Sequence, residues 1–340
     1  MKTKNGMIKR LKVILLFLVP IFLVIFSLAW GSTGVLGIEE LYDHIVAALH
    51  PTGGSGTVNE NMATILWQVR LPRILLTFLV GAALAVSGAV LQAIFRNPIV
   101  DPFSLGISSG AAFGAALSML VSFFSITFSA FLFGVLAVGI TYLVSYSKTR
   151  TTLITMVLSG MIISGVFTAF LTVLQYMSDP YKLQAIVQWT MGNLHTASWA
   201  KLNSSVLPIV GGILLIIIFR WRLNLLALGD EESMAVGVNP KGMKLLMIGL
   251  ATMITAASVS AVGMISLFGL IVPHLTRIIF GPNNQIGVFA NISIGGSFLL
   301  LIDDLSRTLM PFEIPIGVFT MLLGAPLFIY LMRKNAVNWN

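Results

Sequence analysis

The amino-acid sequence predicts an all-α polytopic membrane protein, on three observations. Of its 340 residues, 57% are hydrophobic. Only 9% are charged, whereas soluble domains carry about 25% charged residues. The apolar stretches are continuous and of helix length, which favours helices over the alternating pattern of a β-barrel. We therefore expect residues 1–340 to form a single transmembrane domain of about ten helices.

The first half of the chain contains five apolar runs that could cross a bilayer. A basic segment, residues 2–12, precedes the first run, which is longer than the core of a usual signal peptide and is therefore expected to be a retained helix. The second run begins near Met62 or Pro72. We place the five helices at residues 13–30, 62–95 (or 72–95), 103–121, 123–146 and 153–177.

The second half contains five more apolar runs. A short interfacial helix is expected before them, between residues 181 and 194. We place the five spanning helices at residues 202–219, 245–262, 264–280, 286–305 and 316–332. If the two halves share a fold, an odd number of helices in each makes them inverted relative to one another, as in many transporters.

The distribution of basic residues predicts the orientation of these helices. The sequence holds 20 Lys and Arg residues, and this path leaves only five of them on the outer side. Those five are Arg70, Arg73, Lys182, Lys201 and Arg307. Positive charge favours the cytoplasmic side, and the acidic loop 31–61 has neither Lys nor Arg, so it is placed outside. Both termini and the basic turn 147–151 are therefore expected in the cytoplasm.

Residues 70–110 join several unusual features in one stretch. Two arginines stand at the start of an apolar helix whose residues 81–89 are mostly Gly, Ala and Ser, which permit close helix packing. The segment 97–102 follows, and its two prolines exclude a continuous helix there. We expect a hinge at the cytoplasmic face.

The outer arginines Arg70, Arg73 and Arg307 contradict the positive-inside bias. The first two also lie near the expected start of a helix, where the dipole disfavours cations. Two interpretations remain open from these residues alone. The arginines could reach lipid phosphates, or they could bind an acidic protein partner.

The cytoplasmic segment 225–244 is either a solvated linker or a docking element. It holds a compact acidic turn, Asp230 to Glu232, bracketed by Gly229 and Gly237, which predicts a short helix with an acidic first turn. Apolar residues surround that turn, and a solvated linker has no need of them. Docking is the interpretation we favour.

Motifs for chemistry are lacking. The chain has no cysteine, its four histidines are scattered, and it contains no phosphate-binding loop, dinucleotide fingerprint or zinc motif. The acids nearest the helices, Asp101 and the pair Asp303 and Asp304, lie close to helix ends rather than at the bilayer centre. We therefore expect no catalytic residue, no metal site and no cofactor. The net charge of +8 is explained by topology, so nucleic acid is not expected as a partner.

Several segments together resemble one known family. They are R-L-P-R at residues 70–73, V-G-A-A-L-A-V-S-G-A-V-L-Q at 80–92, R-N-P at 96–98, G-I-S-S-G-A at 106–111, L-A-L-G at 226–229, A-V-G-V at 235–238, F-G-L-I-V-P-H at 268–274, E-I-P-I-G at 313–317 and L-G-A-P-L-F at 323–328. In this order they resemble the permease subunits of the FecCD type, which belong to type II ABC importers for iron–siderophores, haem and cobalamin.

The resemblance implies a transport subunit rather than an enzyme. A second permease subunit, identical or related, would complete the pathway, and two separate ABC ATPase subunits would hydrolyse ATP. An extracytoplasmic substrate-binding protein would deliver the ligand by docking on Arg70, Arg73 and Arg307. The ATPase would be coupled through Gly229, Asp230, Glu231, Ala235 and Gly237. The fifth and tenth helices would line the pathway, although no individual pathway residue is identified.

The expected function is thus import of an iron(III)–siderophore chelate across the cytoplasmic membrane. Haem or cobalamin is the alternative substrate within the same class. An ion-coupled secondary transporter is the alternative from another class, although such proteins usually carry acids at the membrane centre. A membrane-embedded enzyme is disfavoured by the missing catalytic set.

Overall fold

A computed structural model describes residues 2–31, 34–35, 60–122, 124–146 and 153–335. These ranges are almost wholly helical, and they include one short antiparallel ladder that pairs Trp30 with Val35. Most of the expected acidic loop 31–61, and the expected basic turn 147–151, lie outside the described residues.

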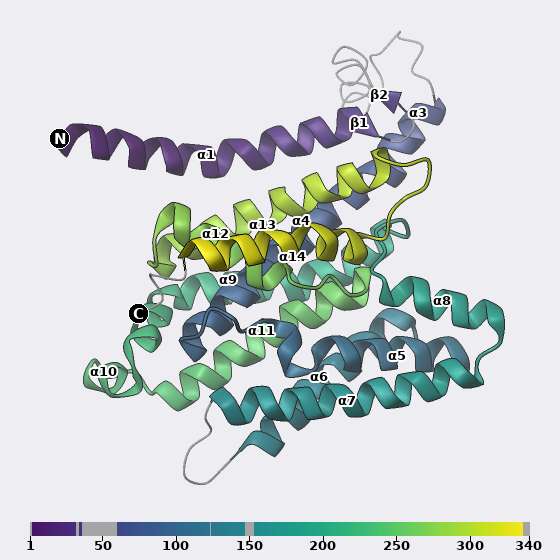
Figure 1. The fold of residues 1–340 in the computed structure, drawn as a ribbon. Coiled ribbons are helices and arrows are strands. Elements are labelled where there is room, and N and C mark those ends of the chain that lie inside the picture. The colour runs from purple at the N-terminus through teal and green to yellow at the C-terminus, as the bar shows by residue number, and fades with distance from the viewer. Residues whose placement is uncertain (1, 32–33, 36–59, 123, 147–152, 336–340) are drawn as a thin grey trace.

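The described chain consists mainly of long helices joined by short connections (Figure 1). In chain order they are α1 (Lys2–Ala29), β1 (Trp30–Gly31), β2 (Gly34–Val35), α3 (Glu60–Thr64), the π-helix η1 (Ile65–Arg70), α4 (Leu71–Phe95), the 3-10 helix η2 (Pro102–Leu105), α5 (Ile107–Val121), α6 (Ile126–Ser145), α7 (Leu153–Met177), α8 (Pro180–Thr190), α9 (Trp199–Leu228), α10 (Asp230–Ala235), α11 (Pro240–Val262), α12 (Phe268–Phe280), α13 (Asn284–Thr308) and α14 (Ile316–Asn335).

The all-α membrane fold predicted from composition is confirmed. Among the described residues, seven helices are long and apolar enough to cross a membrane. Three shorter apolar helices, Ile107–Val121, Phe268–Phe280 and Ile316–Tyr330, occupy the remaining predicted positions. The expected interfacial helix is α8, and the expected acidic turn is α10.

One predicted boundary was wrong, and one open alternative is decided by the structure. The sixth spanning helix does not end at residue 219, because α9 continues to Leu228, with Leu223 and Leu226 buried on its inner face. Only Gly229 ends it. The second spanning helix has the earlier of its two predicted starts, near Met62: it begins at Glu60, runs through one π-helical segment and passes directly into α4.

The helices lie roughly side by side, so that the bundle has two ends (Figure 1). At one end lie α10, the start of α1 and the end of α14; we call this the α10 end. At the opposite end lie α3, β1 and α8; we call this the α8 end.

Helix α4 forms the centre of the bundle. In its spanning segment 83% of the residues are buried, the highest share among the candidate spans, followed by 78% for α11. Helices α9, α11, α12 and α13 all pack against α4. Small residues let neighbouring helices approach closely on several sides, and this explains why the small-residue run lies at the centre of the bundle.

Glycines allow the closest of these contacts. A Cβ atom on Gly88 would lie 1.8 Å from the carbonyl oxygen of Gly269 in α12, and one on Gly81 would lie 2.4 Å from that of Gly295 in α13. Neither position has room for a side chain. The packing interpretation of the 81–89 run is therefore supported by direct backbone contact.

The second spanning helix of each half packs against helices of the other half. Helix α4 packs against α12 and α13, while α11, its counterpart in the second half, packs against α5 and α6. Helices α4 and α11 contact each other. Two related five-helix halves would give this arrangement, so it supports the inverted-repeat hypothesis.

The expected hinge follows α4. Arg96 adopts a left-handed conformation (φ 50°) that ends the helix. Asp101 then caps η2, since its Oδ1 accepts a hydrogen bond from the Phe103 amide at 3.1 Å. Burial raises the pKa of Asp101 to about 6, and this hydrogen bond only partly opposes the effect.

Replacing Gly88 by alanine should destabilise the bundle, because the new methyl group would overlap the Gly269 backbone. We expect a lower melting temperature in detergent, corresponding to a loss of about 1–3 kcal/mol. Gly249→Ala is the control: it is an exposed position of α11, and a Cβ there meets nothing within 4 Å. A Gly88→Ala protein as stable as Gly249→Ala would refute the close approach.

Asp101→Asn tests the partly buried hinge carboxyl through its pH dependence. A folded-state pKa above the unfolded value of 3.8 means that the native protein binds the extra proton, so wild-type stability falls as pH rises from about 4 through about 6. Asparagine keeps the capping acceptor but does not ionise. The melting temperature of the variant relative to wild type should therefore be higher at pH 8 than at pH 5. If the difference in melting temperature between variant and wild type were the same at pH 5 and pH 8, the raised pKa of Asp101 would be contradicted.

Candidate functional site

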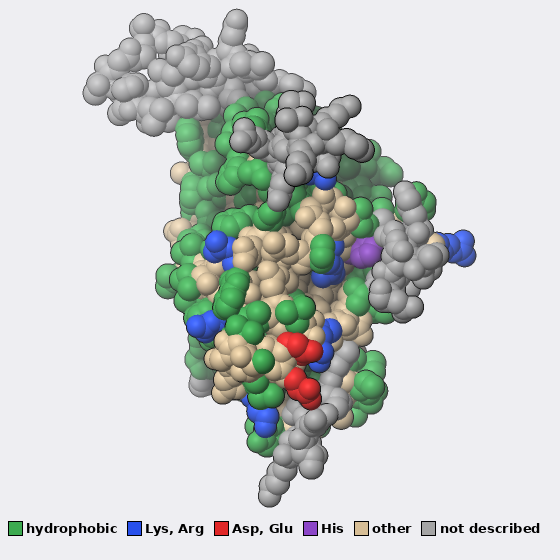
Figure 2. Space-filling model, turned by 90° about the vertical axis from the view of Figure 1, so that its left-hand side faces the viewer, with side chains coloured by type: hydrophobic (Ala, Val, Ile, Leu, Met, Phe, Trp, Pro, Cys, Tyr) green, Lys and Arg blue, Asp and Glu red, His purple; other side chains and the backbone are tan. Residues whose placement is uncertain are grey.

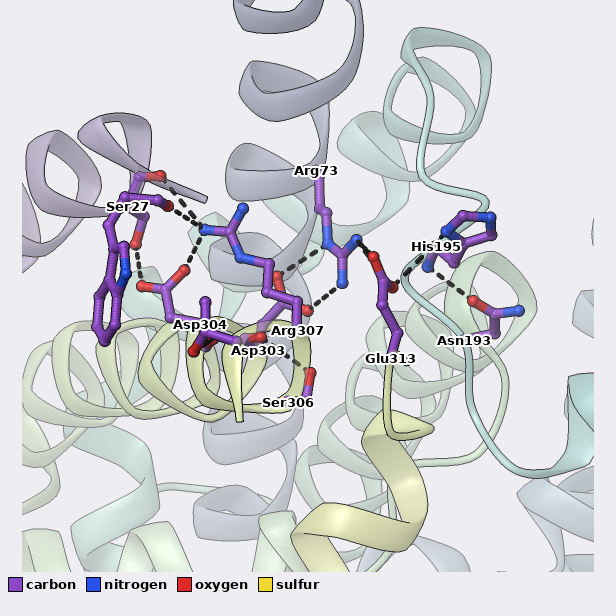
Figure 3. Close-up of polar contacts among 11 residues, drawn as sticks. Ser27, Arg73, Asn193, His195, Asp303, Asp304, Ser306, Arg307 and Glu313 are labelled. Atoms are coloured by element: carbon purple, nitrogen blue, oxygen red, sulfur yellow. Dashed lines mark hydrogen bonds and ion pairs between the residues drawn. The ribbon is translucent and has the colours of Figure 1, made fainter. Parts of the chain in front are cut away.

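The α8 end of the bundle carries a network of buried charges centred on Arg73 (Figure 3). Nε and Nη2 of Arg73 donate to the two carboxylate oxygens of Asp303 on α13, at 3.0 and 2.8 Å. Nη1 donates to both oxygens of Glu313, at 3.0 and 3.1 Å. The Arg73 guanidinium on α4 thus joins α13 to the segment that precedes α14, and its bidentate contact with Asp303 is the geometry typical of arginine–carboxylate pairs.

The other two outer arginines lie beside the end of α1. Nη1 of Arg70 donates to the Leu28 carbonyl at 2.7 Å, and Nη2 of Arg307 donates to the carbonyls of Ser27 and Trp30, at 3.2 and 2.9 Å. The last carbonyl groups of a helix have no partner within the helix and form its negative pole. Arg70 and Arg307 donate hydrogen bonds to such carbonyl groups, and they also place positive charge at the negative pole.

Asp304 completes the contact between α1 and α13. It forms an ion pair with Arg307, one turn further along the same helix, and accepts a hydrogen bond from the Ser27 hydroxyl at 2.5 Å. Both carboxylates of the Asp303–Asp304 pair therefore neutralise arginines. Both acids lie near the end of α13, as the sequence predicted.

The surroundings expected for the three arginines need correction. Arg70, Arg73 and Arg307 are only 4%, 8% and 6% exposed, so they do not stand free at the surface. Arg70 and Arg73 also do not begin a helix, because α3 and η1 precede them without a break. The described side-chain contacts are with protein groups, and the idea that they reach lipid phosphates finds no support in them.

Glu313 is the member of the network that sequence reasoning did not single out. Burial raises its pKa, but the hydrogen bonds and charge of Arg73 outweigh this effect and hold the pKa below its usual value. His195 lies on its other side, with 3.7 Å between Nδ1 and Oε2. The signal in the sequence was the presence of three acids and three arginines at the same predicted end of the helices.

A cavity of about 320 Å³ opens beside this network. Arg73, Glu313 and His195 line it, together with Gln188 and Asn193 from the α8 region. Arg70 and Arg307 are not among the residues that line it. Of the three predicted arginines, Arg73 is therefore the one that a molecule entering from the α8 end can approach.

The turn between α9 and α11 forms a second candidate site, at the α10 end. Gly229 (φ 157°) and Gly237 (φ 80°) adopt backbone conformations suited to glycine and bracket α10. The Ser233 hydroxyl donates to the Gly229 carbonyl at 2.5 Å, and Lys244 pairs with Asp230 at 2.5 Å. The predicted residues Gly229, Asp230, Glu231, Ala235 and Gly237 therefore lie together in one ordered turn.

The surface of this turn combines exposed apolar and acidic side chains. Leu228, Met234 and Val236 are each more than half exposed, and Glu231 and Glu232 are exposed beside them. Figure 2 views this end and shows carboxylates gathered at one place among basic and hydrophobic side chains. Exposed apolar residues rimmed by charge are typical of a protein interaction site.

The described residues show no metal centre. Within the ranges that the structure covers, no group of three or more His, Asp or Glu side chains is placed to hold a metal ion. The candidate sites among the described residues are therefore two surfaces, one at each end of the bundle.

Comparison with known proteins assigns the family. The model of the FecCD transport family matches residues 17–334. The molybdate import permease MolB of Haemophilus influenzae is 40% identical over 280 residues, which are 81% of this chain and 83% of MolB. A Helicobacter pylori protein named as an iron chelatin transport permease is 37% identical over 276 residues, or 81% and 84% of the two chains.

A solved structure agrees with these relatives. It is an inward-facing metal-chelate-type ABC transporter, and it matches with a TM-score of 0.81 and 36% identity over 94% of this chain and 97% of that one. Since the family model, the relatives and the structure all cover most of the chain, the protein belongs to the FecCD transport family of ABC-importer permeases.

Proposed function

We propose that this chain is the membrane permease of an ATP-driven importer that carries an iron(III)–siderophore chelate across the cytoplasmic membrane. The observation that carries the proposal is the α10 turn, an exposed docking element of apolar and acidic residues at one end of a multi-helix membrane domain. The α8 end, with its cavity and arginine network, supplies the surface for delivery of the substrate.

The orientation follows from charge. The α10 end holds the start of α1, the end of α14 and the basic residues around α10, such as Lys241 and Lys244 (Figure 1). We place this end in the cytoplasm, together with both termini, because Lys and Arg favour that side. The α8 end then faces outwards, towards a substrate-binding protein.

An importer of this kind would also contain two ATPase subunits and a second permease subunit. Two ATPase subunits would bind the α10 turns of two permease subunits. The second permease subunit, identical or related, would cover part of the apolar surface of α7 and α14, where residues such as Phe170 and Leu322 are exposed. The chain itself would remain a transport subunit without catalysis, embedded in the lipid bilayer.

The three arginines would divide the work of docking. Arg73 lines the cavity and is the candidate for contact with an acidic residue of the binding protein. Arg70 and Arg307 would support that surface indirectly, because they hold the end of α1 in place.

The relatives do not agree on one substrate, since one is named for molybdate and another for iron chelatin. An iron chelate is the proposal here because it fits the metal-chelate type of the structural neighbour. Haem or cobalamin remains the alternative within the class.

An ion-coupled secondary transporter is the alternative from another class. Among the described residues, the carboxylates inside candidate spans are Asp303 and Asp304, and both are engaged by arginines. Committed carboxylates of this kind are poor candidates for an ion-coupling site, which disfavours that alternative.

Uptake measurements distinguish the two classes. The permease complex is purified with its co-purifying ATPase and binding protein, identified by mass spectrometry, and reconstituted in vesicles. We expect uptake of radiolabelled iron(III)–siderophore to stop when the ATPase is inactivated and to continue when ion gradients are collapsed at constant ATP. Uptake without a functional ATPase would exclude the proposal. Competition by haem or cobalamin for uptake of the labelled siderophore would reveal these alternative substrates.

Met234→Ser tests the α10 turn. Met234 is 57% exposed and makes no part of the core, so the change should leave folding intact while it removes apolar contact with the ATPase. We expect substrate-stimulated ATP hydrolysis to fall by about tenfold, the effect of a central interface residue. Val121→Ser, at the last residue of α5, is the control, because Val121 is 59% exposed and belongs to neither proposed interface. Equal stimulation in the two variants would show that α10 does not couple the ATPase.

A further inference from the structure

Arg73 holds two carboxylates that differ sharply in accessibility. The side chain of Asp303 is 1% exposed, whereas that of Glu313 is 32% exposed. Asp303 uses the Nε and Nη2 edge of the guanidinium, and Glu313 uses Nη1. Both carboxylates line the cavity, but one edge of Arg73 is occupied by the almost fully buried Asp303 and the other by the more exposed Glu313.

Glu313 belongs to a connection rather than to a helix. Residues 309–315 join α13 to α14, and Leu309, Met310 and Phe312 in this segment are each more than half exposed. The backbone bond from the Ile314 amide to the Ser306 carbonyl, at 3.1 Å, fixes the end of the segment behind Glu313. Rotation of the Glu313 side chain alone would open Nη1 of Arg73 to the cavity.

We propose that Glu313 is a displaceable internal ligand of Arg73, and that an acidic side chain of the substrate-binding protein replaces it on docking. This inference rests on the proposed importer function and adds the mechanism of recognition. The exchange substitutes one carboxylate for another, so Arg73 and Asp303 never lose charge balance in a buried place. The released Glu313 moves into water beside His195, which is itself 73% exposed.

The exchange has two consequences. Glu313 competes with the partner, so it weakens docking and suppresses binding of proteins whose acids are wrongly placed. Docking also removes the link between α4 and the start of α14. A binding event at the surface would thus loosen a helix that the family resemblance places along the pathway.

A purely structural role for Glu313 makes the opposite prediction. If Glu313 only holds the connection 309–315 in its docking-competent shape, its loss would weaken binding of the partner. The two roles therefore differ in the sign of the effect on affinity, and not merely in its size.

The decisive variant is Glu313→Gln, which keeps the size of the side chain but removes its charge. Affinity is measured by biolayer interferometry between the permease in nanodiscs and the substrate-binding protein that co-purifies with it. We expect the Kd to fall by about fivefold, since a partly exposed ion pair no longer competes. Asp179→Asn, an exposed helix cap on α8 whose capping bonds asparagine preserves, is the control and should leave the Kd unchanged.

A second background isolates the competition. Arg73→Gln alone would leave Asp303 buried without a partner, so the double variant Arg73→Gln/Asp303→Asn is used, with its fold checked by melting temperature. In this background Glu313→Gln should give no gain in affinity, because there is no guanidinium to release. An unchanged or higher Kd for Glu313→Gln alone, or the same gain in both backgrounds, would overturn the proposal. Failure of the wild-type permease to bind the partner at all would instead refute the proposed function.

Discussion

The backbone contact between α4 and its neighbours is the constraint on which the other features depend. Gly81 meets Gly295 of α13, and Gly88 meets Gly269 of α12, at separations that exclude any side chain. In a bilayer, apolar surface gives helices little reason to associate, so close packing of small residues must provide much of the attraction. The same contact aligns α4 with α13, and this alignment brings Arg73 within hydrogen-bond distance of Asp303.

The buried arginines Arg73 and Arg307 at the α8 end are tolerated because each forms an ion pair with a carboxylate. Burying an arginine or a carboxylate alone would cost several kcal/mol, and a pair is tolerated only when its hydrogen bonds are satisfied. Arg73 meets this condition with Asp303 and Glu313. Arg307 pairs with Asp304 and donates from Nη2 to the carbonyls of Ser27 and Trp30, while its buried Nε has no hydrogen-bond partner among the described residues. Glu313 is more exposed than Asp303 and Asp304, so among these carboxylates it is the one whose displacement from its arginine costs the least free energy.

The docking surfaces proposed at the two ends of the bundle differ in their chemistry. At the α10 end the turn is held by contacts of Ser233 and Lys244 and exposes apolar side chains such as Met234. At the α8 end the proposed docking group is the Arg73 guanidinium, which lines a cavity and is already paired with carboxylates of the protein itself. The first arrangement suits a permanent subunit, and the second suits a partner that binds and leaves.

The amino-acid sequence by itself determined the membrane fold, the positions of ten apolar helices, the hinge at residues 97–102 and the short acidic helix α10. These features depend on local hydrophobicity, on proline and glycine, and on charge near helix ends, all of which can be read along the chain. It also placed Arg70, Arg73 and Arg307 at one end of the helices. Only the tertiary structure decided what they contact, because Asp303 and Glu313 are 230 and 240 residues away from Arg73 in the chain. Pairing over such separations follows from which helices pack together, and the packing of α4 against α13 is a property of the folded bundle.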